Sequence, residues 1–196
     1  MVYTTVARQH LEALFGNSTH GLISFSIKDE VAWFDQGYGE IDEIIKSIGN
    51  LGEKEYFIAP CTFHLNNDGH FKRQADLAFS MPGLWFDVDV QDQAHAQEAL
   101  PTREEAEAFI VSLPLKPSLE IWSGHGFHLY WIFREPFIIE TPEDRVRAQR
   151  LSRGFQRALI KEGASRGWAF DNTGDLARTL RLAGSLNHKA QPPVEV

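Results

Sequence analysis

The stretch Trp85–Val90 (WFDVDV) constrains the fold more than any other part of the chain, because apolar residues alternate in it with two aspartates. Alternation with a period of two is typical of a β-strand, in which successive side chains point to opposite faces. Asp87 and Asp89 should therefore share one face, while the apolar residues between them bury the other. The pattern predicts a strand over Leu84–Val90 that holds two carboxylates side by side.

This pair of carboxylates indicates a divalent-metal site. Two carboxylates on one strand face repel each other unless a cation lies between them, and apolar surroundings make an unpaired charge costly. Mg²⁺ and Mn²⁺ prefer such oxygen ligands and can bind phosphate oxygens at the same time. The pattern alone leaves the activity open, since glycosyltransferases and several unrelated nucleotidyltransferases use it. An ordinary exposed strand would also alternate in this way.

A second candidate segment is a glycine-rich turn between two expected strands, Leu119–Ser123 and Phe127–Phe133. Glycines allow a backbone to approach a phosphate closely. His128, at the start of the second strand, could donate a hydrogen bond to a triphosphate oxygen, or could simply be a packed strand histidine. We expect His125, at the tip of the turn, to be exposed to solvent rather than functional.

A third candidate segment begins at Phe170, after a short strand expected over Trp168–Phe170. Asp171, at the end of that strand, could complete a metal cluster with the first two aspartates. Asp175 is better placed to cap a helix that follows. The sequence therefore favours Asp171 as the third acidic residue and leaves Asp175 as the alternative.

The expected helix Leu176–Leu182 carries two arginines. Arg178 and Arg181 are three residues apart, so on a helix they would lie on one face. There they could bind phosphates, or they could pair with acids nearby.

The charge of the chain is unevenly distributed. Its net charge of −8 looks unsuited to a nucleic-acid partner, because phosphates are usually bound by Lys and Arg. However, Thr141–Lys189 holds ten Lys or Arg against five Asp or Glu, a net charge of +5 that leaves −13 for the remainder. A polyanion would bind to this basic C-terminal third of the chain. Alternatively, the Lys and Arg residues of a helix expected over Glu143–Lys161 could simply form its solvent-exposed face.

The remaining patterns predict one α/β (α+β) domain over residues 1–190, with residues 191–196 as a tail or the start of a linker to a missing C-terminal region. No apolar run approaches the roughly 20 residues of a membrane helix, and the N-terminus lacks signal-peptide order, so we expect a cytoplasmic protein without membrane contact. The single cysteine, Cys61, is expected in the core and excludes a Cys-rich zinc module. The other expected elements are a helix from Thr4 or Thr5 to Gly16-Asn17, a strand over Gly21–Ile27, a helix over Glu40–Ile48, a strand over Glu55–Pro60, a long loop over Asn66–Ser80, and a helix from Thr102 to Leu113.

In this order and at this spacing, the three candidate segments resemble the archaeo-eukaryotic primase superfamily, specifically the primase-polymerase (Prim-Pol) domains of plasmid, phage and CRISPR-associated replication proteins. The family pattern is a hydrophobic run with D-h-D/E, then small-x-His, then hydrophobic-Asp, and it matches Phe86–Asp89, Gly126–His128 and Phe170–Asp171. The segment Arg178–Lys189 (RTLRLAGSLNHK) resembles the family's R-x-x-R-x-x-G-[ST]-x-N-x-K. Two features depart from the pattern: Ala183 stands where relatives often have proline, and the ligands for a zinc element are absent.

The resemblance spans about Glu55 to Lys189, and it implies a mixed, largely antiparallel sheet of the primase-polymerase type. This is an RRM-like catalytic core with an N-terminal αβ module, flanked by helices. The implied activity is template-dependent nucleotidyl transfer, as a DNA primase, a DNA polymerase or both, with two Mg²⁺ or Mn²⁺ ions and no zinc. The implied partners are nucleoside triphosphates, a single-stranded DNA template with its primer, and a helicase domain or protein. Two alternatives stay open, a non-catalytic RRM-like module that binds single-stranded nucleic acid or nucleotide, and a metal-dependent nuclease.

The same resemblance assigns roles to individual residues. The catalytic metal ligands would be Asp87, Asp89 and Asp171; the triphosphate would meet Ser123, His128, Arg178, Arg181, Ser185 and Lys189; and Lys72 and Arg73 would be further contacts to phosphate or DNA.

Overall fold

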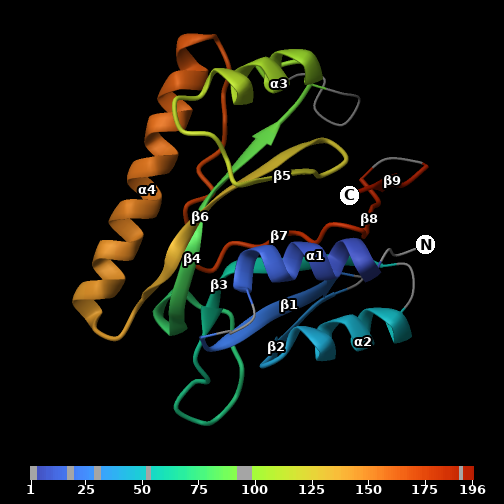
Figure 1. The fold of residues 1–196 in the computed structure, drawn as a ribbon, viewed down its shortest axis with the longest axis vertical. Coiled ribbons are helices and arrows are strands. Elements are labelled where there is room, and N and C mark those ends of the chain that lie inside the picture. The colour runs from blue at the N-terminus through green and yellow to red at the C-terminus, as the bar shows by residue number, and fades with distance from the viewer. Residues whose placement is uncertain (1–3, 17–19, 29–31, 52–53, 92–98, 190–191) are drawn as a thin grey trace.

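An antiparallel sheet runs through the protein and carries helices along its length (Figure 1). The computed structural model describes residues 4–16, 20–28, 32–51, 54–91, 99–189 and 192–196. The strand order is β2-β1-β3-β4-β6-β5, and the short β7 also pairs with β3. All the pairings formed in this sheet by the described residues are antiparallel, which confirms an α/β fold with a largely antiparallel sheet. The elements are α1 (Thr4–Phe15), β1 (Leu22–Lys28), β2 (Trp33–Tyr38), α2 (Ile41–Leu51), β3 (Glu55–Phe63), β4 (Ala78–Asp89), α3 (Arg103–Ser112), β5 (Leu119–Trp122), β6 (Gly126–Ile138), α4 (Pro142–Ser165), β7 (Leu180–Arg181), β8 (Leu186–Asn187) and β9 (Val194–Glu195).

The strands β4 and β6 form the long central pair, and their register places the two strand motifs opposite each other. Asp87 lies opposite His128, and Asp89 lies opposite Gly126. Glycine is required at position 126, because a Cβ there would collide with the carbonyl oxygen of Val88. The close approach of the two strands thus brings the start of β6 against the end of β4, where the aspartates lie.

The N-terminal half of the sheet packs against α1 and α2, which lie next to each other (Figure 1). Phe25 of β1 stacks on Tyr56 of β3, with ring centres 5.4 Å apart, and Phe25 also meets the ring of Tyr38 edge-on. Cys61 is fully buried, as expected. The strand β2 was not predicted, because its first four residues are exposed and carry no alternating apolar pattern.

The C-terminal half is built on two capped helices. Thr102 and Thr141 each form a capping box at the start of α3 and α4, accepting a hydrogen bond from the backbone of the residue three positions on. The helix α4 packs on the central pair, where Phe155 meets Trp131 with ring centres 4.7 Å apart. The predicted helices from Thr102 and over Glu143–Lys161 are therefore confirmed, and α4 continues to Ser165.

The expected helix over Leu176–Leu182 is wrong. A turn is followed there by the extended β7, in which Leu180 and Arg181 lie opposite Ile58 and Phe57 of β3. The strand β3 pairs with β4 only near Thr62 and Phe63, so its remaining edge can accept another strand. Hydrogen bonding to that free edge of β3 therefore overrides the local preference of this segment for a helix.

Other expected boundaries also shift. Trp168–Phe170 is not a strand, although Ala169 donates a backbone hydrogen bond to Ala99. The loop expected over Asn66–Ser80 ends earlier, since a 3-10 turn over Ala75–Leu77 leads into β4. In the expected tail, β9 pairs with β8, while Gln191 and the helix end at Asn17 lie outside the described residues. Of the described helices, none is long and apolar enough to cross a membrane.

Candidate functional site

A cavity of about 130 Å³ brings together seven of the residues that the sequence predicted as site residues. It lies where the end of β4 and the start of β6 face the segment that contains β7. Three different candidate segments therefore contribute to one cavity. The predicted residues that line it are Asp87, Asp89, Ser123, His128, Arg178, Arg181 and Lys189, and the other lining residues are Phe57, His125, Thr179, Leu180 and Asn187.

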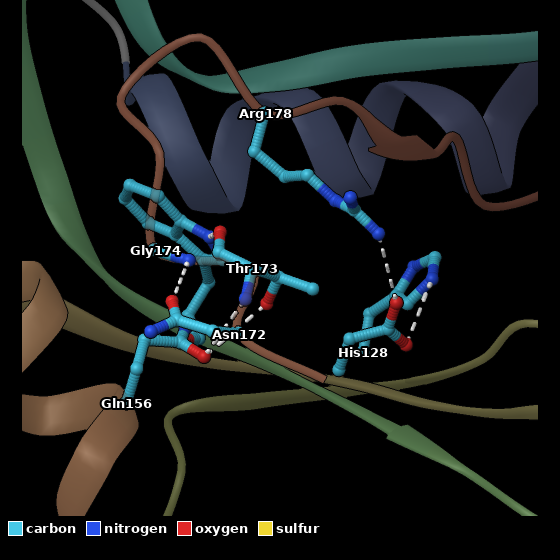
Figure 2. A network of polar contacts seen from close by, with 8 residues as sticks. His128, Gln156, Asn172, Thr173, Gly174 and Arg178 are labelled. Atoms are coloured by element: carbon cyan, nitrogen blue, oxygen red, sulfur yellow. Dashed lines mark hydrogen bonds and ion pairs between the residues drawn. The ribbon is translucent and has the colours of Figure 1, made fainter. Parts of the chain in front are cut away.

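Asp87 lies between His128 and Arg178 in this cavity. Its side chain is only 14% exposed, with one oxygen 3.7 Å from Nε2 of His128 and the other 3.7 Å from a guanidinium nitrogen of Arg178. Figure 2 shows the side chains of His128, from β6, and Arg178, from the segment before β7, pointing toward each other. Burial raises the pKa of Asp87, and this exceeds the opposing effect of the charges on Arg178 and Lys189. A carboxylate in this situation is stabilised by a further cation.

The opposite wall of the cavity is cationic. Arg181 is buried, donates a hydrogen bond of 2.6 Å to Glu55 and lies over the ring of Phe57. Arg178 is 42% exposed and reaches the cavity from the turn before β7. With Lys189, these two arginines place three positive side chains opposite the aspartates. Such an arrangement suits a ligand that carries both phosphates and a divalent cation.

Glu55 fixes Arg181 in place. Burial alone would raise the pKa of Glu55, but its hydrogen bond to Arg181 and the charges of Arg181 and Lys28 together hold that pKa below its usual value. Glu55 is therefore ionised at neutral pH and neutralises the buried guanidinium. This pair could not be predicted from the sequence, since its partners lie 126 residues apart.

His128 is buried and neutral. Burial lowers its pKa to about 3, and the charges of Arg181 and Arg178 act in the same direction. Its Nδ1 has no hydrogen-bond partner in the part of the chain that the structure describes. A neutral imidazole can donate one hydrogen bond and accept another, which a polar ligand in the cavity could use.

The donor set suits a hard divalent ion only in part. Asp87 and Asp89 offer two neighbouring carboxylates in a partly buried setting. Asp171 is exposed and does not line the cavity, although its charge contributes to the raised pKa of Asp87. Across the described ranges of the chain, no three His, Cys, Asp or Glu side chains are grouped closely enough to hold a metal ion. Asp175 accepts a hydrogen bond of 2.8 Å from the backbone of Ala177 and so caps the local turn.

A glutamine of α4 fixes the segment that follows Asp171 (Figure 2). The side chain of Gln156 donates a 2.6 Å hydrogen bond to the carbonyl oxygen of Trp85, and its own oxygen accepts from the backbone and hydroxyl of Thr173. The indole of Trp85 closes this network with a 2.8 Å hydrogen bond to the carbonyl oxygen of Thr173. The buried network ties the segment to β4 and thereby sets where Arg178 enters the cavity.

Besides Asp171, three predicted residues lie outside the cavity. Ser185 is fully buried, and its hydroxyl donates a 2.6 Å hydrogen bond to the carbonyl oxygen of Leu182. Lys72 is exposed. Arg73 pairs with Asp35 of β2 at 3.1 Å and also donates to a backbone oxygen of the segment before β7, so its guanidinium braces β2 against that segment.

His125 was expected to be exposed, and this is wrong, since it is buried and lines the cavity. The turn lies beneath the C-terminal β8, whose Asn187 donates a 2.7 Å hydrogen bond to the carbonyl oxygen of Ser123. Asn187 occupies the asparagine position of the R-x-x-R-x-x-G-[ST]-x-N-x-K pattern, which was a usable signal. Phe57 carried no comparable signal, because it is one of nine buried residues in β3.

The comparisons with known proteins bear on the fold. No family model matches the sequence, and no curated protein matches it significantly. Among solved structures, the chain is similar to the AEP domain of the primase-polymerase (PrimPol) of Cyanophage S-2L, with a TM-score of 0.60 and 18% sequence identity over 95% of this chain and 84% of that chain. At this identity, the likeness concerns the arrangement of the elements. The chain therefore has the primase-polymerase fold of the archaeo-eukaryotic primases.

Proposed function

We propose that the protein catalyses template-dependent nucleotidyl transfer, as a DNA primase, a DNA polymerase or both. One observation carries the proposal, namely that a pair of strand aspartates faces a wall of three cationic side chains within one cavity of a primase-polymerase fold. Nucleoside triphosphates bring phosphates and divalent ions together, which is the combination that such a cavity would bind.

Asp87 and Asp89 would hold the Mg²⁺ or Mn²⁺ ions. When bound, the ions would activate a 3′-hydroxyl and neutralise the leaving pyrophosphate. Arg181, Arg178 and Lys189 would bind the triphosphate, with Arg181 held rigidly and Arg178 able to follow the ligand. The neutral His128 and the hydroxyl of Ser123 would add hydrogen bonds. Five residues would thus contact the triphosphate, namely Ser123, His128, Arg178, Arg181 and Lys189.

Asp171 remains our proposed third acidic ligand. It lies near enough to affect the pKa of Asp87, and its side chain is exposed and thus free to turn. The carboxylate of Asp175 is instead engaged in the turn at Ala177. Ser185 would act indirectly, by holding the backbone between β7 and β8.

The proposed template and primer would meet a basic face of α4. The segment from Arg145 to Lys161 contains six Lys or Arg and no acid. Four of these side chains project from the outer part of the helix, and among the described residues none of the four has an ion-pair or hydrogen-bond partner. They are the exposed Arg150, Arg153, Arg157 and Lys161. Phosphates of a nucleic-acid backbone are the complementary partner.

The test is nucleotide incorporation into a primed single-stranded DNA template with Mg²⁺ or Mn²⁺, together with dinucleotide formation in the absence of primer. We expect the double variant Asp87→Asn, Asp89→Asn to lose activity by about a thousandfold or more, since metal ions contribute several kcal/mol of transition-state stabilisation. The matched control is Asp68→Asn, Asp76→Asn, which removes the same charge from exposed positions outside the cavity.

Three outcomes would replace the proposal. Full activity in the Asp87/Asp89 double variant would remove the metal role of the pair. Loss of primer without extension would indicate a nuclease. Metal-independent binding of single-stranded DNA without turnover would indicate a non-catalytic module.

A further inference from the structure

A half-exposed tryptophan lies beside the candidate site, on the edge strand of the sheet. Trp33 begins β2, and 48% of its surface is exposed. Its ring lies 4.6 Å from the ring of Phe57 on β3, with the two planes tilted by 42°. Phe57 itself lines the cavity, and the guanidinium carbon of Arg181 lies 4.8 Å from its ring centre. The two rings therefore form a continuous aromatic surface from the cavity to the solvent-exposed edge.

The surroundings of this aromatic surface are polar and charged. Lys28 lies opposite Trp33 in the strand register and pairs with Glu55 at 3.4 Å. Glu55 in turn holds Arg181. A large aromatic ring that stays exposed within a polar rim, next to a binding cavity, is typical of a contact surface.

We propose that Trp33, supported from behind by Phe57, stacks on a nucleobase of the ligand that occupies the candidate site. The inference rests on the proposed function, since it takes the ligand to be a nucleotide or a nucleic acid. The cationic wall would bind the phosphates, and the aromatic surface begins where that wall ends, at Arg181. Aromatic rings stack on any of the bases, because every base has a π-face. The stacked base belongs either to the incoming nucleotide or to the single-stranded template, and its chemistry is the same in both.

The edge strand supplies its own control residue. Phe34 follows Trp33 and is 57% exposed, so it resembles Trp33 in size and accessibility. Successive side chains of a strand point to opposite faces, and Phe34 therefore points away from the face that Trp33 shares with Phe57. A stacking role at the site belongs to Trp33 and not to Phe34.

The first experiment compares two oligonucleotides that differ only in their bases. Dissociation constants of fluorescein-labelled oligothymidylate and of an abasic oligonucleotide of equal length are measured by fluorescence anisotropy. If the stacked base belongs to the template strand, we expect Trp33→Ala to weaken binding of the thymidylate about tenfold, and to leave binding of the abasic strand within about twofold. Trp33→Phe should retain most of the affinity, and Phe34→Ala should change neither ligand. An equal loss for both strands in Trp33→Ala, or an equal loss in Phe34→Ala, would overturn the stacking role.

The second experiment identifies the source of the base. Binding of a nucleoside triphosphate and of inorganic tripolyphosphate is measured by calorimetry with Mg²⁺. If Trp33→Ala weakens binding of the nucleoside triphosphate but not binding of tripolyphosphate or of the oligonucleotide, the stacked base is that of the incoming nucleotide. If Trp33→Ala weakens only the binding of the thymidylate, the stacked base is a template base. If it weakens the binding of neither base-containing ligand, the inference fails.

Failure of this inference and failure of the proposed function give different results. A protein that incorporates nucleotides normally while Trp33→Ala binds every ligand like the unaltered chain refutes stacking and leaves nucleotidyl transfer intact. A protein that binds nucleotide through Trp33 but never forms a phosphodiester bond refutes nucleotidyl transfer and leaves stacking intact.

Discussion

Arg178 and Arg181 line the same cavity, but their side chains are held very differently. Arg181 is buried between the Glu55 carboxylate and the Phe57 ring. Arg178 is 42% exposed, and its guanidinium lies 3.7 Å from the carboxylate of Asp87. Removing one partner of a buried ion pair leaves an uncompensated charge, whereas a loose, exposed pair contributes little.

We therefore predict that the two arginines separate stability from ligand binding. Arg181→Gln should lower the free energy of unfolding by about 3 kcal/mol, because it leaves Glu55 buried without its main partner. Arg178→Gln should change that free energy by about 0.5 kcal/mol or less. Urea denaturation of both variants measures the difference, and nucleotide binding should weaken in both. Similar losses of stability in the two variants would contradict this division of roles.

The sequence predicted the strand that carries the aspartates correctly and the conformation around the arginines wrongly, and the reason is physical. Period-two alternation around Asp87 and Asp89 is a local property that any strand displays. The spacing of Arg178 and Arg181 is equally local, yet their conformation is decided by the free edge of β3, far away in the sequence. The ion pair with Glu55 is likewise invisible until the sheet has formed.

The helices and strands show the same contrast between local and long-range determinants. The helices α3 and α4 could be predicted because capping residues and apolar spacing are written within each segment. The strands β2 and β7 could not, because they are short and owe their conformation to a neighbouring strand. Of these two strands, β7 lines the cavity and β2 lies beside it, so long-range pairing shapes the walls of the candidate site.

The exposed cations on the outer face of α4 should contribute to the salt dependence of DNA binding. Changing Arg150, Arg153 and Arg157 together to Gln should reduce the steepness with which the binding constant for single-stranded DNA falls with salt. The slope of log K against log [salt] should decrease by about 2, since each phosphate contact contributes about 0.7 on single strands. Anisotropy titrations at several salt concentrations measure it. The control changes Lys46, Lys116 and Arg134, which are also exposed, to Gln. An equal change of slope in the control would show that net charge alone is responsible.

At the scale of the whole molecule, α1 is joined to the segment after β7 through a buried histidine. Nδ1 of His10 accepts a 3.1 Å hydrogen bond from the backbone of Ala183, and its ring meets Tyr130 of β6 edge-on at 5.4 Å. Burial lowers the pKa of His10 to about 3, and the nearby His128 acts in the same direction. His10 is thus neutral in the folded protein, whereas an unfolded chain binds a proton at an ordinary pKa near 6.5.

The protein should therefore lose stability as the pH falls. The contribution of His10 is fully present above pH 6.5 and is lost progressively between about pH 6.5 and pH 3, because only the unfolded chain takes up the proton in that range. From pH 7 to pH 5, this amounts to about 2 kcal/mol. His10→Asn keeps an acceptor near the position of Nδ1 and removes the titration, so its free energy of unfolding should fall less over the same interval. Parallel pH profiles for the two proteins, measured by urea denaturation, would contradict the assignment.

The β7–β3 pairing makes the cavity a long-range product of the chain. Loop-closure entropy grows with loop length, by about 0.6 kcal/mol per doubling, and Glu55 and Arg181 are 126 residues apart. The two-residue β7 should therefore open before the β4–β6 pair that carries the aspartates. An anion that binds Arg178 and Arg181 also ties β7 to the sheet, so ligand occupancy and local opening are thermodynamically linked. We expect a nucleoside triphosphate to slow amide hydrogen exchange at Leu182, which bonds to Tyr56 of β3, more than at β4. Equal slowing at both places would mean that β7 does not open by itself.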